Sequence, residues 1–333
     1  MSVKGYKAFN KGMICRGKQY EENTTYEESG NKICEAGVMH FCENPFNVLN
    51  YYPLVDENGG ISDFAGVEAV GDIYKEKNKA ATNKLHIGVK LGLKGFIKAC
   101  VDFTIEKTRV ESGKDNETDS SGGSAQIGSS GDSAQIGSSG YSAQIGSSGD
   151  SAKIGSSGYY AQIGSSGDYA QIGSSGYYAQ IGSSGDSAKI GSSGDYAQIG
   201  SSGNSAQIGS SGDSAKIGSS GYSAQIGSSG DSAKIGSSGN SAQIGSSGNY
   251  AKIMSEGKNS VVMAAGYESK AKAKIGSWIT LAEWIRTGEM DNDGNYIWIP
   301  RCVKTEYVDG KRIKENTFYK LVDGEFKEVE SED

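Results

Sequence analysis

The chain has 333 residues, including 50 Gly and only three Pro, and a formal net charge of −7. Hydrophobic residues make up 35%. Counting Gly as apolar brings the share into the range of about 45–50% that globular domains have, so composition does not predict a disordered chain. No run approaches the roughly 18 apolar residues of a membrane span, and the N-terminus has no apolar signal segment, so neither a membrane protein nor a secreted one is expected. Five Cys is a low and odd count, which predicts reduced thiols in a reducing compartment.

Residues 1–111 are predicted to form an α+β domain. Apolar residues alternate in four segments, which we expect to be strands: Val3–Phe9, Gly37–Cys42, Phe64–Val70 and 85–91. A helix is predicted after Asn44, with this residue as its cap and Pro45 in its first turn. A second helix is predicted after Gly92, where the apolar spacing becomes helical. The polar segment 112–123 is interpreted as a connector.

Several segments of this domain carry a family resemblance: Lys4–Lys7, Cys15–Gly17, Gly37–Pro45 and Asn50–Tyr52. Together they resemble the N-terminal domain of a family of bacteriophage and prophage proteins that has no assigned function. The resemblance covers roughly residues 3–105, and usual members have Phe where this chain has Val38 or Met39. Members often continue into Ala-x-Ile repeats, as this chain does. The resemblance implies a phage context and expression inside a bacterial cell, and it implies no chemistry.

The order of elements in this domain is also similar to that of ADP-ribosyltransferases. In that reading Arg16, His40 and Glu68 are the residues to test for catalysis. Because an order of elements is only an analogy, our preferred reading is a domain without catalytic residues.

Metal-binding residue types are present without metal-binding spacing. Cys15, Cys34, His40 and Cys42 contain no CxxC pair, so we interpret them as buried thiols and a strand histidine. The segment Asp291–Gly294 begins like a calcium loop but lacks the Gly and Glu that the loop requires further on, and we interpret it as a turn. We therefore expect neither a metal nor a cofactor.

A nine-residue repeat begins at Ser124 and contains fifteen copies of Ala-x-Ile, from Ile127 to Ile253. Ala and Ile alternate with Gln or Lys, which predicts a short strand with Ala and Ile inside. The Gly-Ser-Ser-Gly segment is expected to turn the corner, because Gly accepts a positive φ. A fixed short period predicts a β-solenoid over residues 124–267. One buried Ile contributes about 1.5–3 kcal/mol, less than the ordering of nine residues costs, so the coils must stabilise one another.

Asp and Tyr alternate at one corner position, which predicts 18 residues per coil. Like residues would then stack, and the stacked Tyr could form a binding surface along the rod. The candidate binding residues of the repeat are all Tyr: Tyr141, Tyr159, Tyr160, Tyr169, Tyr177 and Tyr178. The alternative is that the rod is only a spacer. The repeat region has 5 Lys and 7 Asp, which gives a net charge of −2. Duplex DNA of the same length carries roughly 21 negative charges, so the repeat region is not expected to imitate DNA.

Residues 268–333 are predicted to be β-hairpins that cap the solenoid. Asp309-Gly310 is expected to join strands Tyr296–Tyr307 and Arg312–Leu321, and Asp323-Gly324 to form the next turn. As an alternative to a pure cap, three aromatic residues are candidates for a partner surface: Trp278, Trp284 and Trp298.

The expected fold is mainly β, a nonapeptide-repeat solenoid between an α+β domain and a β cap. The expected function is non-enzymatic binding of a host or phage protein in the cytoplasm of an infected or lysogenic bacterium, for example as an anti-defence factor. The alternatives are a virion or tail-fibre component and, further off, an ADP-ribosyltransferase. No basic patch predicts nucleic-acid binding, no membrane association is expected, and homo-oligomer formation stays open.

Overall fold

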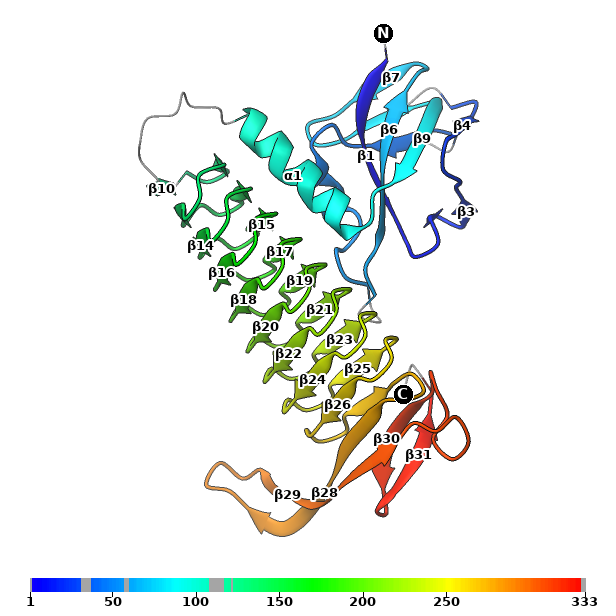
Figure 1. The fold of residues 1–333 in the computed structure, drawn as a ribbon, viewed down its shortest axis with the longest axis vertical. Helices are drawn as coiled ribbons and strands as arrows, with labels where there is room; N and C mark the ends of the chain where they lie inside the picture. Colours follow the sequence, from blue (N-terminus) through cyan, green and yellow to red (C-terminus); the bar gives the residue numbers. More distant parts are fainter. Residues whose placement is uncertain (1, 31–36, 57–59, 108–116, 121, 331–333) are drawn as a thin grey trace.

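The computed structural model describes residues 2–30, 37–56, 60–107, 117–120 and 122–330. An N-terminal α+β domain lies against a β-solenoid, and a group of C-terminal strands continues the far end of the solenoid (Figure 1). The predicted mainly β fold is therefore confirmed. Among the described residues, no helix has the length and hydrophobicity of a membrane span.

The N-terminal domain is built on small antiparallel sheets. The larger sheet has the order β1 (Val3–Phe9), β6 (Asp63–Ala69), β9 (Lys84–Lys90) and β4 (Thr24–Glu27). The smaller sheet has the order β5 (Met39–Phe41), β8 (Ala80–Thr82) and β7 (Ile73–Lys75), and β2 (Ile14–Cys15) pairs with β3 (Lys18–Gln19). The strands predicted at 3–9, 64–70 and 85–91 are confirmed to within one residue.

Both predicted helices form. The first is a single 3₁₀ helix, η1 (Pro45–Asn50), in which the Asn44 side chain accepts a hydrogen bond from the Phe46 amide at 3.0 Å. The second is α1 (Leu93–Lys107), whose Phe96 ring stacks on Phe64 of the sheet with centroids 3.8 Å apart. Helix α1 lies between the N-terminal sheet and the solenoid (Figure 1). It is part of the core of the N-terminal domain, and it also covers one face of the solenoid.

Each coil of the solenoid contributes one strand to each of two parallel sheets. Partners are 18 residues apart, so that Ile136 pairs with Ile154, which confirms two nonapeptides per coil. One sheet, which we call the covered sheet because the N-terminal domain packs on it, contains β11 (Gln126–Ser129), β13 (Gln144–Ser147), β15 (Gln162–Ser165), β17 (Gln180–Ser183), β19 (Gln198–Ser201), β21 (Lys216–Ser219), β23 (Lys234–Ser237), β25 (Lys252–Ser255) and β27 (Lys270–Lys272). The other, which we call the open sheet, contains β10 (Glu117–Ser120), β12 (Gln135–Ser138), β14 (Lys153–Ser156), β16 (Gln171–Ser174), β18 (Lys189–Ser192), β20 (Gln207–Ser210), β22 (Gln225–Ser228), β24 (Gln243–Ser246) and β26 (Val261–Ala264).

Side chains alternate along every repeat strand. In β17, Ile181 and Ser183 point inward and are fully buried, whereas Gln180 and Gly182 face outward. The predicted inward Ile is confirmed, and the buried Ala residues complete the same core. The first Ser of the repeat was expected in the turn, but it belongs to the strand and faces the interior, because the strand continues for two residues beyond the Ile.

The corner geometry also differs from the prediction. In most repeats the left-handed backbone lies at the residue that precedes the Ala, for example at Tyr169 with φ 57° and Ser187 with φ 57°. The corner Gly has no left-handed φ and is required for close stacking, because a Cβ on Gly167 would lie 2.0 Å from the carbonyl oxygen of Gly149 in the neighbouring coil. A side chain at this position would therefore force adjacent coils apart.

The C-terminal strands extend both sheets. The open sheet continues into β28 (Trp278–Met290), parallel to β26, and then β29 (Tyr296–Tyr307), which forms a long hairpin with β28. The covered sheet continues into β30 (Phe318–Val322) and β31 (Glu325–Val329). The hairpin predicted at Asp309-Gly310 is wrong, because residues 308–317 carry the chain from one sheet to the other. The turn of the long hairpin is instead Asp291–Gly294, and the turn at Asp323-Gly324 is confirmed.

Candidate functional site

The two sheets of the solenoid have different surroundings although they share one repeat. On the covered sheet, the outward glycines lie directly under α1 and the loop after η1. A Cβ on Gly182 would be 2.0 Å from Ile97 Cδ1, and one on Gly200 would be 3.1 Å from a Leu54 methyl carbon. Because these glycines have no side chain, α1 approaches the sheet closely and buries its apolar face on it.

A ladder of Gln side chains fixes the N-terminal domain on the covered sheet. Gln144 donates to Gln162 at 3.0 Å, and Gln162 donates to Gln180 at the same distance. The ladder also bonds across the interface: Gln180 donates to the Leu49 carbonyl at 3.2 Å, and the Leu54 amide donates to Gln198 at 2.8 Å. The N-terminal domain is therefore held on the covered sheet by side-chain hydrogen bonds as well as by apolar packing.

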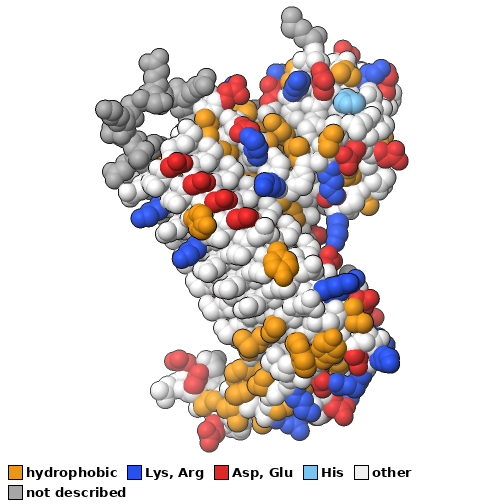
Figure 2. Space-filling view, viewed as in Figure 1, with side chains coloured by type: hydrophobic (Ala, Val, Ile, Leu, Met, Phe, Trp, Pro, Cys, Tyr) orange, Lys and Arg blue, Asp and Glu red, His pale blue; other side chains and the backbone are white. Residues whose placement is uncertain are grey.

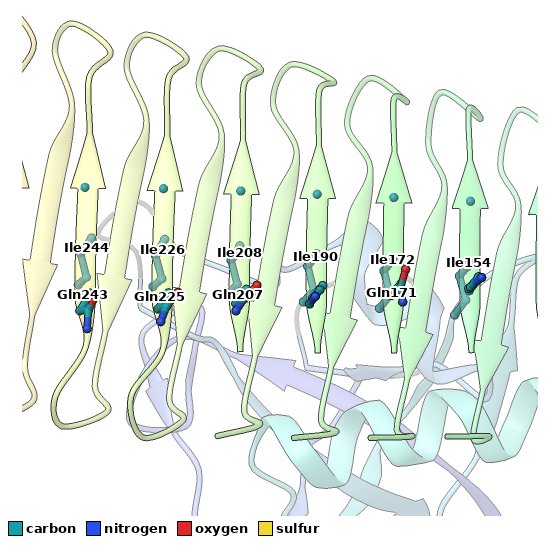
Figure 3. A pocket seen from close by; sticks show the side chains of 18 of the residues that line it. Ile154, Gln171, Ile172, Ile190, Gln207, Ile208, Gln225, Ile226, Gln243 and Ile244 are labelled. Atoms are coloured by element: carbon teal, nitrogen blue, oxygen red, sulfur yellow. The ribbon is translucent and has the colours of Figure 1, made fainter. Parts of the chain in front are cut away.

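The open sheet presents the same residue types to solvent. A shallow hollow of about 1380 Å³ runs along it and is lined by outward Gln, Lys and Gly residues from Gln135 to Met263. Figure 3 shows the labelled Gln side chains repeated from strand to strand, with α1 behind them on the other side of the solenoid. A Cβ on Gly173 or Gly191 would meet no atom within 4 Å. The open sheet thus has the same outward Gln and Gly surface that holds α1 on the covered sheet, but no described part of the chain covers it.

The open sheet becomes apolar at its C-terminal end. Val261 takes the place of the outward Gln and is 49% exposed, Met263 takes the place of the outward Gly and is 43% exposed, and Trp278 of the next strand is 47% exposed. The Trp278 ring contacts that of Tyr307 with centroids 5.1 Å apart. Figure 2 shows hydrophobic side chains gathered at this end of the molecule. Exposed contiguous apolar surface of this kind is typical of protein-binding sites.

The β28–β29 hairpin adds to this apolar surface, because most of its side chains are exposed. Trp298 is exposed and contacts the Tyr267 ring at 4.4 Å, whereas the Trp284 indole is partly buried and donates to the Ala265 carbonyl at 2.9 Å. Of the three predicted Trp, Trp278 and Trp298 are therefore open to a partner, and Trp284 mainly fixes the hairpin to the last coil.

Most of the predicted Tyr residues gather at one corner of the solenoid. Tyr141, Tyr159 and Tyr177 stack with centroids 5.4 and 5.1 Å apart, and Tyr160 and Tyr178 form a second stack beside them at 5.6 Å. Burial, with a smaller effect of the neighbouring rings, raises the pKa of Tyr177 to about 12.

Two Tyr residues depart from the predicted set. Tyr196 continues the second stack at 5.1 Å from Tyr178 and was missed, although its spacing of 18 residues could have identified it. Tyr169 lies at the other corner of the coil, where its backbone amide bonds to the Asp186 carbonyl, so it is not part of the cluster.

The residues proposed for ADP-ribosyl transfer do not converge. Arg16 and His40 line a cavity of about 460 Å³ in the N-terminal domain, whereas Glu68 lines a different hollow with Lys4 and His86. Burial, followed by the charges of Lys7 and other cations, lowers the pKa of His40.

The predicted metal-binding residue types lie partly in the same cavity. Cys15 and Cys42 line it beside His40, and Cys34 lies outside the described residues. Burial raises the pKa of Cys42 to about 12, which disfavours a thiolate ligand. Within the described residues no group of three or more His, Cys, Asp or Glu is placed to hold a metal ion.

Comparison with known proteins gives one match. Residues 3–99 are similar to a family described as a domain of unknown function (DUF7666), which covers the N-terminal domain and leaves the solenoid unmatched. No curated protein matches the chain. No solved structure matches it either.

Proposed function

We propose that the protein is a non-enzymatic binding protein of bacteriophage or prophage origin, and that the open sheet is the surface on which it binds a host or phage protein. The observation that carries the proposal is the contrast between the two sheets. One Gly and Gln surface holds an amphipathic helix of the chain itself, and its repeat on the other sheet is uncovered over seven strands and ends in exposed Val261, Met263 and Trp278.

The covered sheet also indicates what kind of partner would fit. Helix α1 packs there with small and branched side chains such as Ile97, Val101 and Thr104 over the glycines. We therefore propose a partner that presents an amphipathic helix. Lys153 and Lys189 on the open sheet favour acidic residues along the edge of that helix, since opposite charges across an interface favour association.

The biological setting of the proposal rests on the sequence resemblance described above. A phage protein that binds a host protein in the cytoplasm of an infected or lysogenic cell could act as an anti-defence factor. The repeat region, with 5 Lys and 7 Asp, has no charge excess that would favour nucleic acid as the partner.

Quantitative affinity capture from infected cells tests this proposal. A double variant, Gly191→Arg with Gly209→Arg, places two long side chains on the open sheet where a Cβ meets no atom within 4 Å. Tyr222→Arg is the matched control, because Tyr222 is an exposed corner residue away from the sheet face. We expect the partner to be recovered with the wild type and the control and to be depleted at least tenfold with the double variant. Equal recovery with all three proteins would refute the open sheet as the binding surface.

A second candidate function is a structural part of the virion or tail fibre. The exposed apolar side chains of the β28–β29 hairpin favour it, because they would suit contacts between repeated subunits. Mass spectrometry of purified particles tests this candidate, and absence of the protein from the particles would eliminate it.

A further inference from the structure

A buried lysine in the N-terminal domain has only neutral partners. Lys7 of β1 is 6% exposed, and its Nζ donates to the His40 carbonyl at 3.0 Å and contacts the Cys15 thiol. In the described part of the chain no carboxylate lies within 4.0 Å of this ammonium group. An unpaired buried charge is costly, and the Phe9 and Tyr20 rings, each 5.6 Å from Nζ, offset only part of that cost.

A second cation lies at the same cavity. Arg16 is exposed, has a left-handed backbone with φ 50°, and forms no ion pair with a carboxylate of the described residues. Its charge adds to the effect of burial in lowering the pKa of Lys7. Two further cations line the cavity and are paired, Lys18 with Glu28 at 2.6 Å and Lys79 with Glu76 at 3.4 Å. The cavity therefore holds two positive groups, Lys7 and Arg16, that no described carboxylate neutralises.

The remaining walls suit a ring. Tyr20 and Tyr52 line the cavity, together with the apolar residues Val48 and Phe41. The volume of about 460 Å³ is within the range of small-molecule sites. Two positive charges match the charge of about −1.5 to −2 that a phosphate monoester carries at neutral pH, whereas a carboxylate would neutralise only one.

We propose that this cavity binds a phosphate monoester attached to a planar ring, of the nucleoside monophosphate class, with Lys7 and Arg16 contacting the phosphate and the tyrosines contacting the ring. The site is separate from the open sheet, so this inference does not depend on the proposed function.

Isothermal titration calorimetry on the full-length protein tests the proposal, with 5′-AMP, 5′-UMP, adenosine and inorganic phosphate as probes. We expect at least one of the two nucleotides to bind, with adenosine and inorganic phosphate each at least tenfold weaker. Lys7→Met and Arg16→Asn should each weaken nucleotide binding at least tenfold. Asn is chosen because it tolerates the left-handed backbone. Lys4→Met is the matched control on the same strand, since Lys4 lines the other hollow, and it should leave binding unchanged.

Three outcomes would overturn the proposal: no nucleotide binding at millimolar concentration, inorganic phosphate binding as tightly as the nucleotides, or unchanged binding by Arg16→Asn. Circular dichroism shows whether Lys7→Met is folded. If it is not, nucleotide binding by Arg16→Asn alone tests the proposal, because Arg16 is exposed and its substitution leaves the core intact. The Gly191→Arg and Gly209→Arg double variant should still bind the nucleotide, which distinguishes this site from the proposed protein-binding surface.

Discussion

A single outward glycine has opposite consequences on the two sheets. At Gly182 a Cβ would lie 2.0 Å from Ile97 Cδ1, inside the packed interface with α1. At Gly173, on the open sheet, a Cβ would meet nothing within 4 Å. The outward glycine of the repeat is therefore required for packing on the covered sheet. On the open sheet, the fold of the chain does not require it.

Alanine substitutions test this difference. Gly182→Ala should destabilise the protein by about 1–3 kcal/mol, because the buried Ile97 must move from a close-packed position. Gly173→Ala should be neutral or stabilise it by up to about 1 kcal/mol, because Gly in a strand loses more conformational entropy than Ala. The free energy of unfolding from urea denaturation checks both. Equal effects would contradict the arrangement of α1 on the covered sheet.

Residue alternation in the repeat was largely predictable. Inward Ile181 and outward Gln180 follow from the period of two in a strand, and both are observed. The inward direction of Ser183 was not predicted, because a small hydroxyl residue next to Gly is also typical of a turn. The open-sheet glycines were missed as a candidate site because glycine carries no side-chain chemistry, and their meaning depends on what lies above them.

At the scale of the element, the corners are stabilised by ladders of Asp side chains. The Asp168 amide donates to Asp150 Oδ1 at 2.8 Å, and the Asp186 amide donates to Asp168 Oδ1 at 2.7 Å. Each carboxylate thus links two coils, which offsets the repulsion between charges stacked about 4.8 Å apart. Asn204 Oδ1 accepts the equivalent hydrogen bond from the Tyr222 amide at 3.0 Å. The negative charge of Asp is therefore not needed for this hydrogen bond between coils.

Substitutions at Asp168 separate the hydrogen bond from the charge. Asp168→Asn keeps the acceptor and removes the repulsion, so it should leave stability unchanged or raise it by a few tenths of a kcal/mol. Asp168→Ala removes the acceptor and should lower stability by about 0.5–1.5 kcal/mol. Thermal denaturation at low and high salt measures both, and any gain of the Asn variant should shrink with salt. A loss for Asn as large as that for Ala would show that the charge itself is needed.

The C-terminal hairpins show why a local turn signal can mislead. Asp309-Gly310 has the sequence of a tight hairpin turn, yet the strands on either side of it lie in different sheets. The Asp309 carboxylate accepts bonds from the Lys311 and Arg312 amides at 2.8 and 2.9 Å, so the local turn forms. The strand pairing is set by the two open edges of the last coil, which a local sequence does not reveal.

At the scale of the whole molecule, the choice of covered sheet could not be predicted. The strands of the two sheets have the same sequence, as β15 and β16 illustrate, so the repeat itself does not distinguish them. The N-terminal domain makes the difference by covering one sheet only. It also reaches the far end of the solenoid, where Lys11 pairs with Glu256 at 3.3 Å.

Deleting repeats tests this organisation. Removing 18 residues, 208–225, deletes one coil and should bring the ends about 4.8 Å closer with each sheet unchanged. Removing nine residues, 208–216, keeps the repeat but moves every later strand to the other sheet, so that the β28–β29 hairpin would continue the covered sheet. The apolar end formed by Trp278 would then leave the open sheet, and partner binding should be lost with the nine-residue deletion and kept with the 18-residue one.

Distance measurements by electron paramagnetic resonance, with spin labels at Lys11 and Met290, distinguish the two deletions. These positions lie on the N-terminal domain and at the exposed end of β28. The 18-residue deletion should shift the distance by only a few ångströms, whereas the nine-residue deletion should change it by much more, because the hairpin moves to the other sheet. The same displacement for both would mean that the coil does not contain two equivalent nonapeptides.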